Sequence, residues 1–483
     1  MRRSPYVAAV ALAIVVVLSF VTGSAAAKRD AAPIGTAAVT ATTVICPAMI
    51  GTGSSTVTSA SIADVSKALT PRAPSGGTVF ASTLLGKKSA TSKLHLAPVA
   101  TVKSHSGLSL ATAVIATGPV AASLGVDEVS ETANAGRFRS LIGSNCQSPA
   151  TNWWFAGADG RVGYSDALFI ANPAPTAAEV AISLWTKKGP ISPPHLGAVA
   201  VPGRSRVAIG IASVAPDDAT IAVHVHADSG AVVAGLVDRR FAALNSNGAD
   251  FVPPTASPAK AGLIPGFFSG VGSRKLVLAD PGPVDATVSV RLVTKSGSFA
   301  PSGANQVVVH QQHTKIIDLT KVFGGQPGAV EWTSDQPVVA EGLMVASDPG
   351  LRPDFMWLAA VPPLSGPAAV ATGTEPDGGK TFVVLTATGG AAVAKLTTPS
   401  GKSRSLRLRA GTSAAVDVTA TINAGSGPAP FVITPIGVAP VYGVRVLVFH
   451  GAHGALITGE PLLSLPHPIQ LPPVRDDPRI AVR

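Results

Sequence analysis

The sequence predicts an all-β protein of tandem immunoglobulin-like β-sandwich domains after an N-terminal signal helix. Three observations indicate this class. Glycine (49) and proline (41) are frequent among the 483 residues, while only 13% are charged and 5% aromatic. Long stretches recur along the chain, and apolar residues alternate with other residues within them. Such a composition suits short strands of small aliphatic residues joined by many turns, and it excludes the highly charged kind of disorder.

The first 27 residues have the pattern of an export signal. Arg2 and Arg3 precede an uncharged stretch that ends at Ala25-Ala26-Ala27, directly before Lys28. A basic start, a short apolar stretch and a small-x-small site define a secretory signal. We expect residues 1–27 to be a signal peptide or, if uncleaved, a signal anchor. The protein would then be extracellular or held in the cell envelope, with the membrane involved through this segment alone.

Two cysteines fit this location. Cys46 and Cys146 both lie in the first predicted unit, residues 40–150, and they are not spaced as a CxxC motif. An even count in an exported chain favours one structural disulfide. The alternative is a reactive thiol or a metal ligand.

Internal repetition organises the rest of the chain. Ala167–Gly189 and Lys275–Gly297 share ten of 23 residues at an offset of 108, and Thr381–Gly401 is a fainter third copy. Each copy consists of an apolar strand, a Pro or Gly turn, an alternating strand and a second Gly turn. This order predicts a β-hairpin. Short helical turns are expected within Ser61–Leu69 and Leu319–Phe323.

The repeats divide the exported part into four units and a tail. A propeller blade has about 40–50 residues, so these units are far too long for blades and match an immunoglobulin-like sandwich instead. The predicted boundaries are 40–150 for the unit with the disulfide, then 151–262, 263–364 and 365–460, followed by a proline-rich tail at 461–483.

Several motifs together resemble a known family. They are Val44-Ile45-Cys46-Pro47, the stretch from Asn152 to Gly157 after Cys146, the recurring Ala-Asn-Pro or Ala-Asp-Pro strand end, and Pro472–Arg475 in the tail. The chain resembles an uncharacterised family of exported or membrane-anchored actinobacterial proteins, a domain of unknown function. The resemblance covers most of the chain after the signal. It implies an envelope location and an all-β fold, and it supplies no catalytic residue.

Catalytic and metal-binding patterns are weak. The sequence has no GxSxG, P-loop or HExxH motif. His224 and His226 are weak metal candidates, since residues two apart on a strand share a face and Asp228 continues it. The related stretch before Asp335 lacks both histidines, which favours an exposed strand face and a turn-forming aspartate. We therefore expect no cofactor, no metal and no catalytic residue.

Trp153 and Trp154 are the candidate ligand-contact aromatics. They form a cluster with Phe155, and neighbouring strand residues point to opposite faces, so at most two of the three rings can share one face; packing of one Trp in the core near Cys146 is the alternative. The formal charge of +10 is spread thinly, and its densest run, Lys402–Arg409, alternates like a solvated strand face. Nucleic acid is therefore not an expected partner.

Together these features predict a non-catalytic cell-envelope protein with a structural or partner-binding role. The expected partner is an envelope protein or a cell-wall glycan. The alternative is a carbohydrate-active module that binds or cleaves a cell-wall polysaccharide.

Overall fold

The computed structural model describes residues 36–46, 57–70, 76–96, 99–104, 111–132, 139–243, 245–371, 379–422 and 429–470. The predicted signal segment at 1–27 and residues 471–483 of the predicted tail lie outside this part. Across the described ranges, no helix has the length and apolar character needed to span a membrane. The chain divides into a smaller unit, Met1–Ala38 with Pro468–Arg483, and a larger one, Val39–His467. In the smaller unit, β1 (Thr36–Ala37) pairs antiparallel with β35 (Ile469–Gln470).

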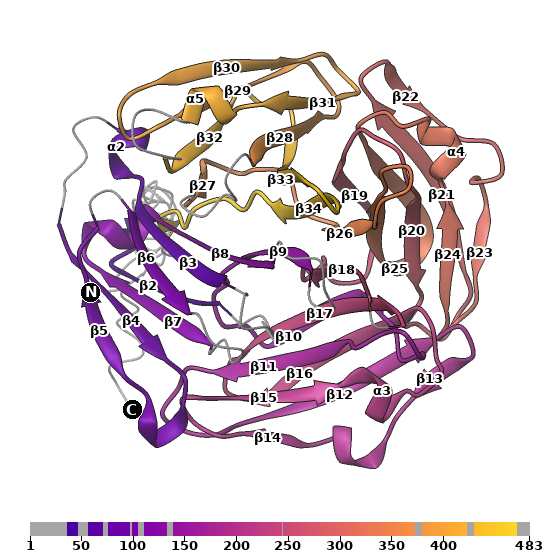
Figure 1. Cartoon of the computed structure of the whole chain (residues 1–483), viewed down its shortest axis with the longest axis horizontal. Coiled ribbons are helices and arrows are strands. Elements are labelled where there is room, and N and C mark those ends of the chain that lie inside the picture. Colours follow the sequence, from indigo (N-terminus) through magenta and orange to yellow (C-terminus); the bar gives the residue numbers. More distant parts are fainter. Residues whose placement is uncertain are drawn as a thin grey trace, which may run out of the picture. The chain divides into compact units, whose positions relative to one another are not determined.

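The larger unit is built almost entirely of antiparallel strands, which confirms the all-β prediction. In its described residues, four consecutive segments follow one another: the first, second and fourth contribute two sheets each, and the third forms one eight-stranded sheet whose two layers share strand β25 (Gly328–Ala346) (Figure 1). The first segment, Ala41–Asn145, holds the sheets β2-β7-β4-β5 and β6-β3-β8-β9. Their bounds are β2 (Ala41–Cys46), β3 (Val57–Asp64), β4 (Thr78–Thr83), β5 (Thr91–Leu94), β6 (Val99–Ser104), β7 (Thr112–Thr117), β8 (Leu124–Thr132) and β9 (Ser140–Asn145).

The second segment, Asn152–Val252, repeats this strand order. Its sheets are β10-β16-β12-β13, with β14 also paired to β12, and β15-β11-β17-β18. The bounds are β10 (Asn152–Ala158), β11 (Ala167–Asn172), β12 (Ala178–Thr186), β13 (Gly189–Ile191), β14 (Val199–Val201), β15 (Ser205–Gly210), β16 (Ile221–Ser229), β17 (Val233–Ala242) and β18 (Asn245–Val252).

The third segment, Ala259–Ala359, has the same order with one difference. Its strand β25 is long enough to serve both sheets, pairing first with β19 and β21 and then with β20 and β26. The bounds are β19 (Ala259–Phe267), β20 (Arg274–Ala279), β21 (Ala286–Thr294), β22 (Gly297–Phe299), β23 (Val307–Val309), β24 (Thr314–Asp318), β25 (Gly328–Ala346) and β26 (Asp354–Ala359).

The fourth segment, Ala368–Pro461, completes the series with β27-β32-β29-β30 and β31-β28-β33-β34. The bounds are β27 (Ala368–Val370), β28 (Lys380–Ala387), β29 (Ala392–Thr397), β30 (Ser403–Leu408), β31 (Thr412–Asp417), β32 (Phe431–Ile436), β33 (Val441–Gly451) and β34 (Gly454–Pro461). Short helices connect strands at α2 (Ser66–Leu69), α3 (Ile211–Val214), α4 (Thr320–Phe323), α5 (Thr419–Ile422), η1 (Gly86–Lys88), η2 (Pro119–Ala122) and η3 (Pro194–Leu196).

The helical turn expected within Leu319–Phe323 is present as α4. Within Ser61–Leu69 the expectation is only partly right, because the residues up to Asp64 continue strand β3 and the helix α2 begins at Ser66.

The predicted hairpin of the repeat is wrong. Strand β11 lies between β15 and β17, whereas β12 pairs with β13, β14 and β16 in the other sheet. Asn172 explains the crossing, because its Oδ1 accepts from the Ala174 N–H while its Nδ2 donates to the Thr176 and Val201 carbonyls. The side chain thus satisfies the turn that carries the chain between sheets. The hairpin forms at the second turn instead, where Thr186 pairs with Gly189.

The predicted disulfide is present between Cys46 and Cys146, which are 100 residues apart and both buried. It connects the end of β2 to the residue after β9. The surrounding hydrophobic cluster contains residues of both sheets of the segment, such as Ile62 on β3 and Val114 on β7. The disulfide therefore links the two sheets through their shared core.

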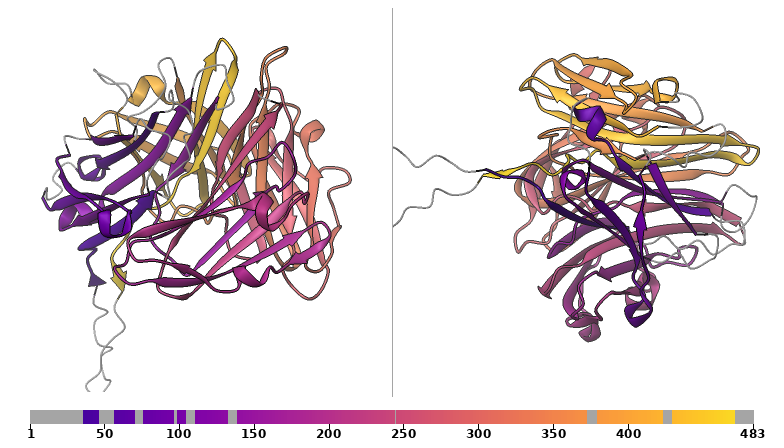
Figure 2. Two further views of the ribbon diagram at one scale, coloured as in Figure 1. Left: turned by 60° about the horizontal axis from the view of Figure 1, so that its bottom comes forward. Right: turned by 90° about the vertical axis from the view of Figure 1, so that its left-hand side faces the viewer.

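The last strand of each segment lies at the centre of the larger unit. Strands β9, β18, β26 and β34 contact one another in succession, and β34 contacts β9 again (Figure 1). The two further views in Figure 2 show the strand groups of different segments, distinguished by colour, side by side. The contacts form a closed series in which the fourth segment meets the first.

Buried carboxyl groups connect these central strands. Asp250 on β18 accepts hydrogen bonds from Thr458 Oγ1 on β34, at 2.7 Å, and from the Trp357 N–H on β26, at 2.9 Å. Asp354 on β26 accepts from the Ile457 N–H at 2.9 Å, and Thr458 Oγ1 accepts in turn from the Gly143 N–H on β9 at 2.8 Å. These side chains take the place of a backbone ladder between the four strands.

Burial shifts the acidity of these groups. It raises the pKa of Asp354 to about 8 and that of Glu460 on β34 to about 7, and it raises the pKa of Asp250 well above its usual range. The folded protein therefore holds protons that the unfolded chain releases at neutral pH.

We predict that Asp354→Asn flattens the pH dependence of stability. A carboxyl with a raised pKa contributes most stability below its unfolded pKa of 3.8 and loses that contribution as pH rises to about 8. In this window the slope is about 1.4 kcal/mol per pH unit for one group. Urea denaturation from pH 5 to 8 gives the free energy of unfolding of the variant and of the original protein. The difference between the two should change by about 1.4 kcal/mol for each pH unit.

Asp217→Asn is the matched control, because it makes the same substitution at a carboxylate that is exposed to solvent. Its unfolding curves should keep the pH slope of the original protein. An Asp354→Asn slope equal to that of the control would contradict the assignment of a buried protonated carboxyl.

Candidate functional site

A charged cavity lies between the second and third segments. Its volume is about 80 Å³, and it is lined by Gly157, Ala158, Asp159, Arg161, Tyr164, Thr220, Arg240, Lys275, Val277, Ile316, Leu343 and Trp357. The second segment supplies the end of β10, the loop after it and β17. The third supplies β20, β24, β25 and β26. A site built this way depends on the contact between two segments.

Arg240 is held in place by Asp238 and by aromatic rings. Its Nε donates to Asp238 Oδ2 at 2.9 Å, and its guanidinium lies over the ring of Phe355, 3.9 Å from the centroid. The same Asp238 oxygen accepts from Trp357 Nε1 at 2.9 Å. Burial acts to lower the pKa of Arg240, but the Asp238 carboxylate outweighs it and the net shift is upward. The guanidinium is therefore a fixed positive charge at the cavity wall.

Arg161 forms the second cationic group. Its Nε and Nη2 donate to the two oxygens of Asp159 at 2.9 and 2.7 Å, and Nη2 lies 3.2 Å from the Tyr164 hydroxyl. The hydrogen bond to Asp159 raises the pKa of Arg161. Buried Asp166 supports this loop by accepting from the Asp159 and Arg239 N–H groups. Burial raises the pKa of Asp166 well above its usual range.

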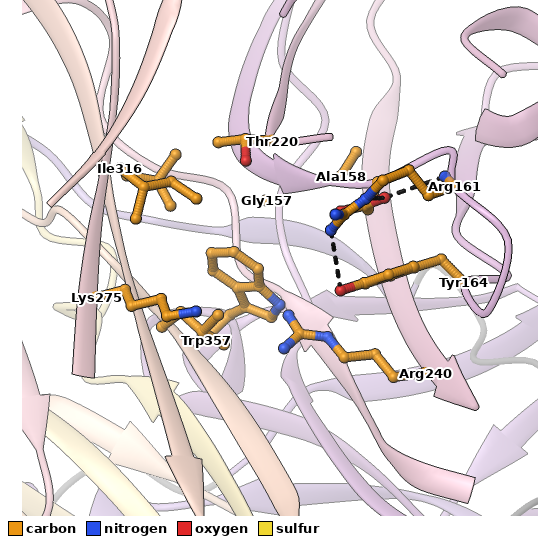
Figure 3. A pocket seen from close by; sticks show the side chains of 12 residues that line it. Gly157, Ala158, Arg161, Tyr164, Thr220, Arg240, Lys275, Ile316 and Trp357 are labelled. Atoms are coloured by element: carbon orange, nitrogen blue, oxygen red, sulfur yellow. Dashed lines mark hydrogen bonds and ion pairs between the residues drawn. The ribbon is translucent and has the colours of Figure 1, made fainter. Parts of the chain in front are cut away.

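Lys275 completes the positive charge from the side of the third segment. Figure 3 shows the side chains of Lys275 and Arg240 extending toward Trp357, with Thr220 and Tyr164 at the border. Guanidinium, ammonium, phenol and hydroxyl groups are all hydrogen-bond donors, and the charged ones are positive. Small-molecule sites usually enclose about 300–1,000 Å³. This cavity therefore suits one acidic group of a larger partner, such as a carboxylate, sulfate or phosphate.

The predicted aromatic residues lie elsewhere. Trp153 is 5% exposed and donates from Nε1 to the Val232 carbonyl at 2.9 Å. Trp154 is 9% exposed and stacks on His224, with a centroid distance of 3.9 Å, and on Trp185 at 5.5 Å. Trp153 thus packs in the core. Trp154 lies on the opposite face of the sheet, where its ring stacks against those of His224 and Trp185.

The structure brings His224 and His226 together at Asn152, where a ring nitrogen of each lies within hydrogen-bond distance of the amide oxygen. Burial and then the neighbouring His226 lower the pKa of His224 to about 4. Among the described residues, no group of three or more His, Cys, Asp or Glu side chains is placed to hold a metal ion.

Sequence reasoning missed the residues of the cavity. Arg161, Arg240, Lys275 and Trp357 are separated by long stretches of chain and stand in no recognisable motif. One signal could have found Arg240. The run Asp238-Arg239-Arg240 continues an otherwise apolar strand, and charged residues in a buried strand need nearby partners.

Comparisons with known proteins give a family and several similar solved structures. A model of a family of unknown function, DUF5719, matches residues 99–419. No curated protein matches the chain. A crystal structure of Thermotoga maritima 1070 shares 14% identity over 22% of this chain and 96% of its own, with a TM-score of 0.19. A structure described under host cell surface retention of a 1.5-MDa bacterial ice-binding adhesin shares 12% identity over 66% of this chain and 100% of its own, with a TM-score of 0.11.

We predict that the two arginines differ sharply in their effect on stability. Arg240→Met leaves Asp238 buried without its ion partner, which costs about 3–5 kcal/mol. Arg161→Met removes a pair whose arginine is half exposed, so its cost is about 0–1 kcal/mol. Chemical denaturation of both variants measures the difference. Equal losses would show that Asp238 and Arg240 do not form a buried pair.

Proposed function

We propose, on the premise that this chain belongs to the DUF5719 family of unknown function, that it is a non-catalytic cell-envelope protein that binds an acidic group of its partner. The partner is an envelope protein or a cell-wall glycan. The observation that carries the proposal is the cavity between the second and third segments, where Arg161, Arg240 and Lys275 surround one small space.

The architecture supports a binding role. We take the two sheets of each segment as one immunoglobulin-like sandwich, because in the fourth segment one hydrophobic cluster joins Val383 and Val441 of one sheet to Leu396 and Phe431 of the other. Four such domains in contact hold the cavity walls at fixed positions. A preformed site loses less conformational entropy when a partner binds.

The chemistry of the cavity also favours binding over catalysis. Its one carboxylate, Asp159, is occupied by Arg161 through two hydrogen bonds. The remaining polar side chains that line it are donors or cations. Such a set stabilises a negative charge, and a guanidinium binds carboxylates and phosphates with good geometry.

The export of the protein is part of the proposal. Residues 1–27 would direct the chain across the membrane, and the Cys46–Cys146 disulfide fits an oxidising compartment. An envelope location would place the cavity beside acidic wall polymers and surface proteins.

We predict that the protein binds an oligosaccharide of galacturonic acid or an octaglutamate peptide through this cavity. Lys275→Gln should weaken binding roughly tenfold, because one charged contact is worth about 1.4 kcal/mol or more. The matched control is Lys187→Gln, which removes the same charge from an exposed position in the turn between β12 and β13, outside the cavity. Isothermal titration at 0.15 M salt measures both.

The two probes distinguish a glycan partner from a protein partner. Equal losses in the Lys275 and Lys187 variants would mean attraction by net charge alone, which contradicts a cavity site. Failure of the original protein to bind either probe would also count against the proposal.

The alternative is a carbohydrate-active module that binds or cleaves a wall polysaccharide. The observation that favours it is the Tyr164 ring, which has Arg161 5.1 Å and Arg240 5.6 Å from its centroid. An aromatic ring beside cations suits a sugar that carries an acid group. Release of new reducing ends from purified cell wall, lost in a Tyr164→Ala variant, would support this alternative over pure binding.

We predict for the native host that the chain is found outside the cytoplasm. Mass spectrometry of the N-terminus after fractionation should give a mature start at Lys28 in the wall or medium, or an intact Met1 in the membrane fraction. A cytoplasmic chain that retains residues 1–27 would rule out the envelope role.

A further inference from the structure

A second site lies on the outer face of the sheet β10-β16-β12, away from the charged cavity. Strand register pairs Asn152 on β10 with His226 on β16, and Trp154 with His224. Residues two apart on a strand, and their cross-strand partners, share one face. Asn152, His224 and His226 therefore stand together, and the side chain of His226 is 45% exposed.

Two imidazole nitrogens converge on one oxygen at this site. His224 Nε2 lies 3.1 Å and His226 Nδ1 lies 2.9 Å from Asn152 Oδ1. Nitrogen and oxygen ligands bind transition metals at about 2.0–2.2 Å. Two ligand atoms at that distance and at right angles are about 3.0 Å apart. Both observed separations are hydrogen bonds in the structure and match this value, so a metal ion could take the place of the two shared protons without moving the three side chains.

We propose that Asn152, His224 and His226 form a surface site for a divalent transition metal, with Cu²⁺ or Ni²⁺ as the preferred ions. Right-angled nitrogen and oxygen ligands are typical of the tetragonal geometry that these two ions adopt, and Cu²⁺ has the highest affinity in the divalent series. The three protein ligands leave further positions of the metal open toward solvent.

Neighbouring groups hold the ligands in position. The Trp154 ring stacks on His224 with an interplanar angle of 10°, which restricts the rotation of that imidazole. Asp228 Oδ1 lies 3.8 Å from His226 Nε2, on the far side of the ring from Asn152. In the structure the ring proton on Nδ1 is donated to Asn152; when a metal replaces it, the ring keeps its other proton on Nε2, facing this carboxylate. The positioning groups of a metal site are thus present around the three ligands.

The spacing of histidines alone does not produce this arrangement. His310 and His313 are also close, with ring centroids 6.2 Å apart, but His310 Nδ1 pairs with Asp285 and His313 Nδ1 with the Gln311 carbonyl. These two nitrogens have different partners. The pair therefore provides a matched control with the same residue type on the same protein.

The test is a calorimetric titration of the full chain with CuCl₂ and, separately, with NiCl₂. For copper, an electron paramagnetic resonance spectrum of the complex is recorded as well. We expect one ion per chain with nitrogen coupling in the copper spectrum. His226→Ala should weaken binding at least tenfold, and Asn152→Leu should do the same, while His310→Ala should leave the affinity unchanged.

Asn152→Asp distinguishes a ligand from a structural residue. An aspartate keeps the size of the side chain and offers a charged oxygen, so affinity should be retained or rise, whereas a purely structural role would not depend on the donor atom. Unchanged affinity and unchanged nitrogen coupling in His226→Ala, with circular dichroism showing a folded protein, would overturn the proposal. Equal losses in His226→Ala and His310→Ala would overturn it as well.

Discussion

Buried contacts between the last and the first segment hold the larger unit closed. Arg445 on β33 lies 3.0 Å from Glu460 in its own segment and 3.4 Å from Asp127 on β8 of the first segment. Asp127 Oδ2 also accepts from the Ala371 N–H, at 2.6 Å. Arg139, just before β9, donates to the Gly454 and Ala455 carbonyls. With these contacts, and with those between β34 and β9, the four segments form a closed series and not an open row with two ends.

The same device recurs between other segments. At the contact of the second segment with the third, the Glu341 carboxyl accepts a hydrogen bond from the Ala156 N–H at 2.6 Å. Asp127 makes the same kind of contact with the Ala371 N–H, where a buried carboxyl of one segment binds a backbone N–H of a neighbouring segment. Burying such carboxyls is costly, and burial raises the pKa of both Asp127 and Glu341. We interpret them as groups that select this one arrangement of segments, because an apolar contact would permit several. A fixed arrangement is also what the charged cavity requires, since its walls belong to two segments.

Sequence patterns predicted local structure well and contacts between segments poorly. The alternation in β12 and the solvated face of β30 could be read directly, because burial on one face imposes a period of two. The pairing of β11 with β15 and β17 could not, since an apolar strand followed by a turn is equally compatible with a hairpin and with a crossing between sheets. Trp357 and Lys275 come near Arg240 only because the third segment packs against the second. The one sequence signal of such contacts is a charged residue within an otherwise apolar strand, as at Asp238, Glu341 and Arg445. This signal predicts a buried polar contact but does not identify the residue on the other side of it.

Hydrogen exchange at equilibrium, read by mass spectrometry on peptic fragments, tests the closure most directly. If buried polar contacts make the four segments one cooperative unit, the slowest amides of β3, β11, β20 and β28 should exchange through a single opening with one free energy. Distinct opening free energies for the first and fourth segments, well below those of the middle two, would contradict a closed unit. The four segments would then be independent domains that touch.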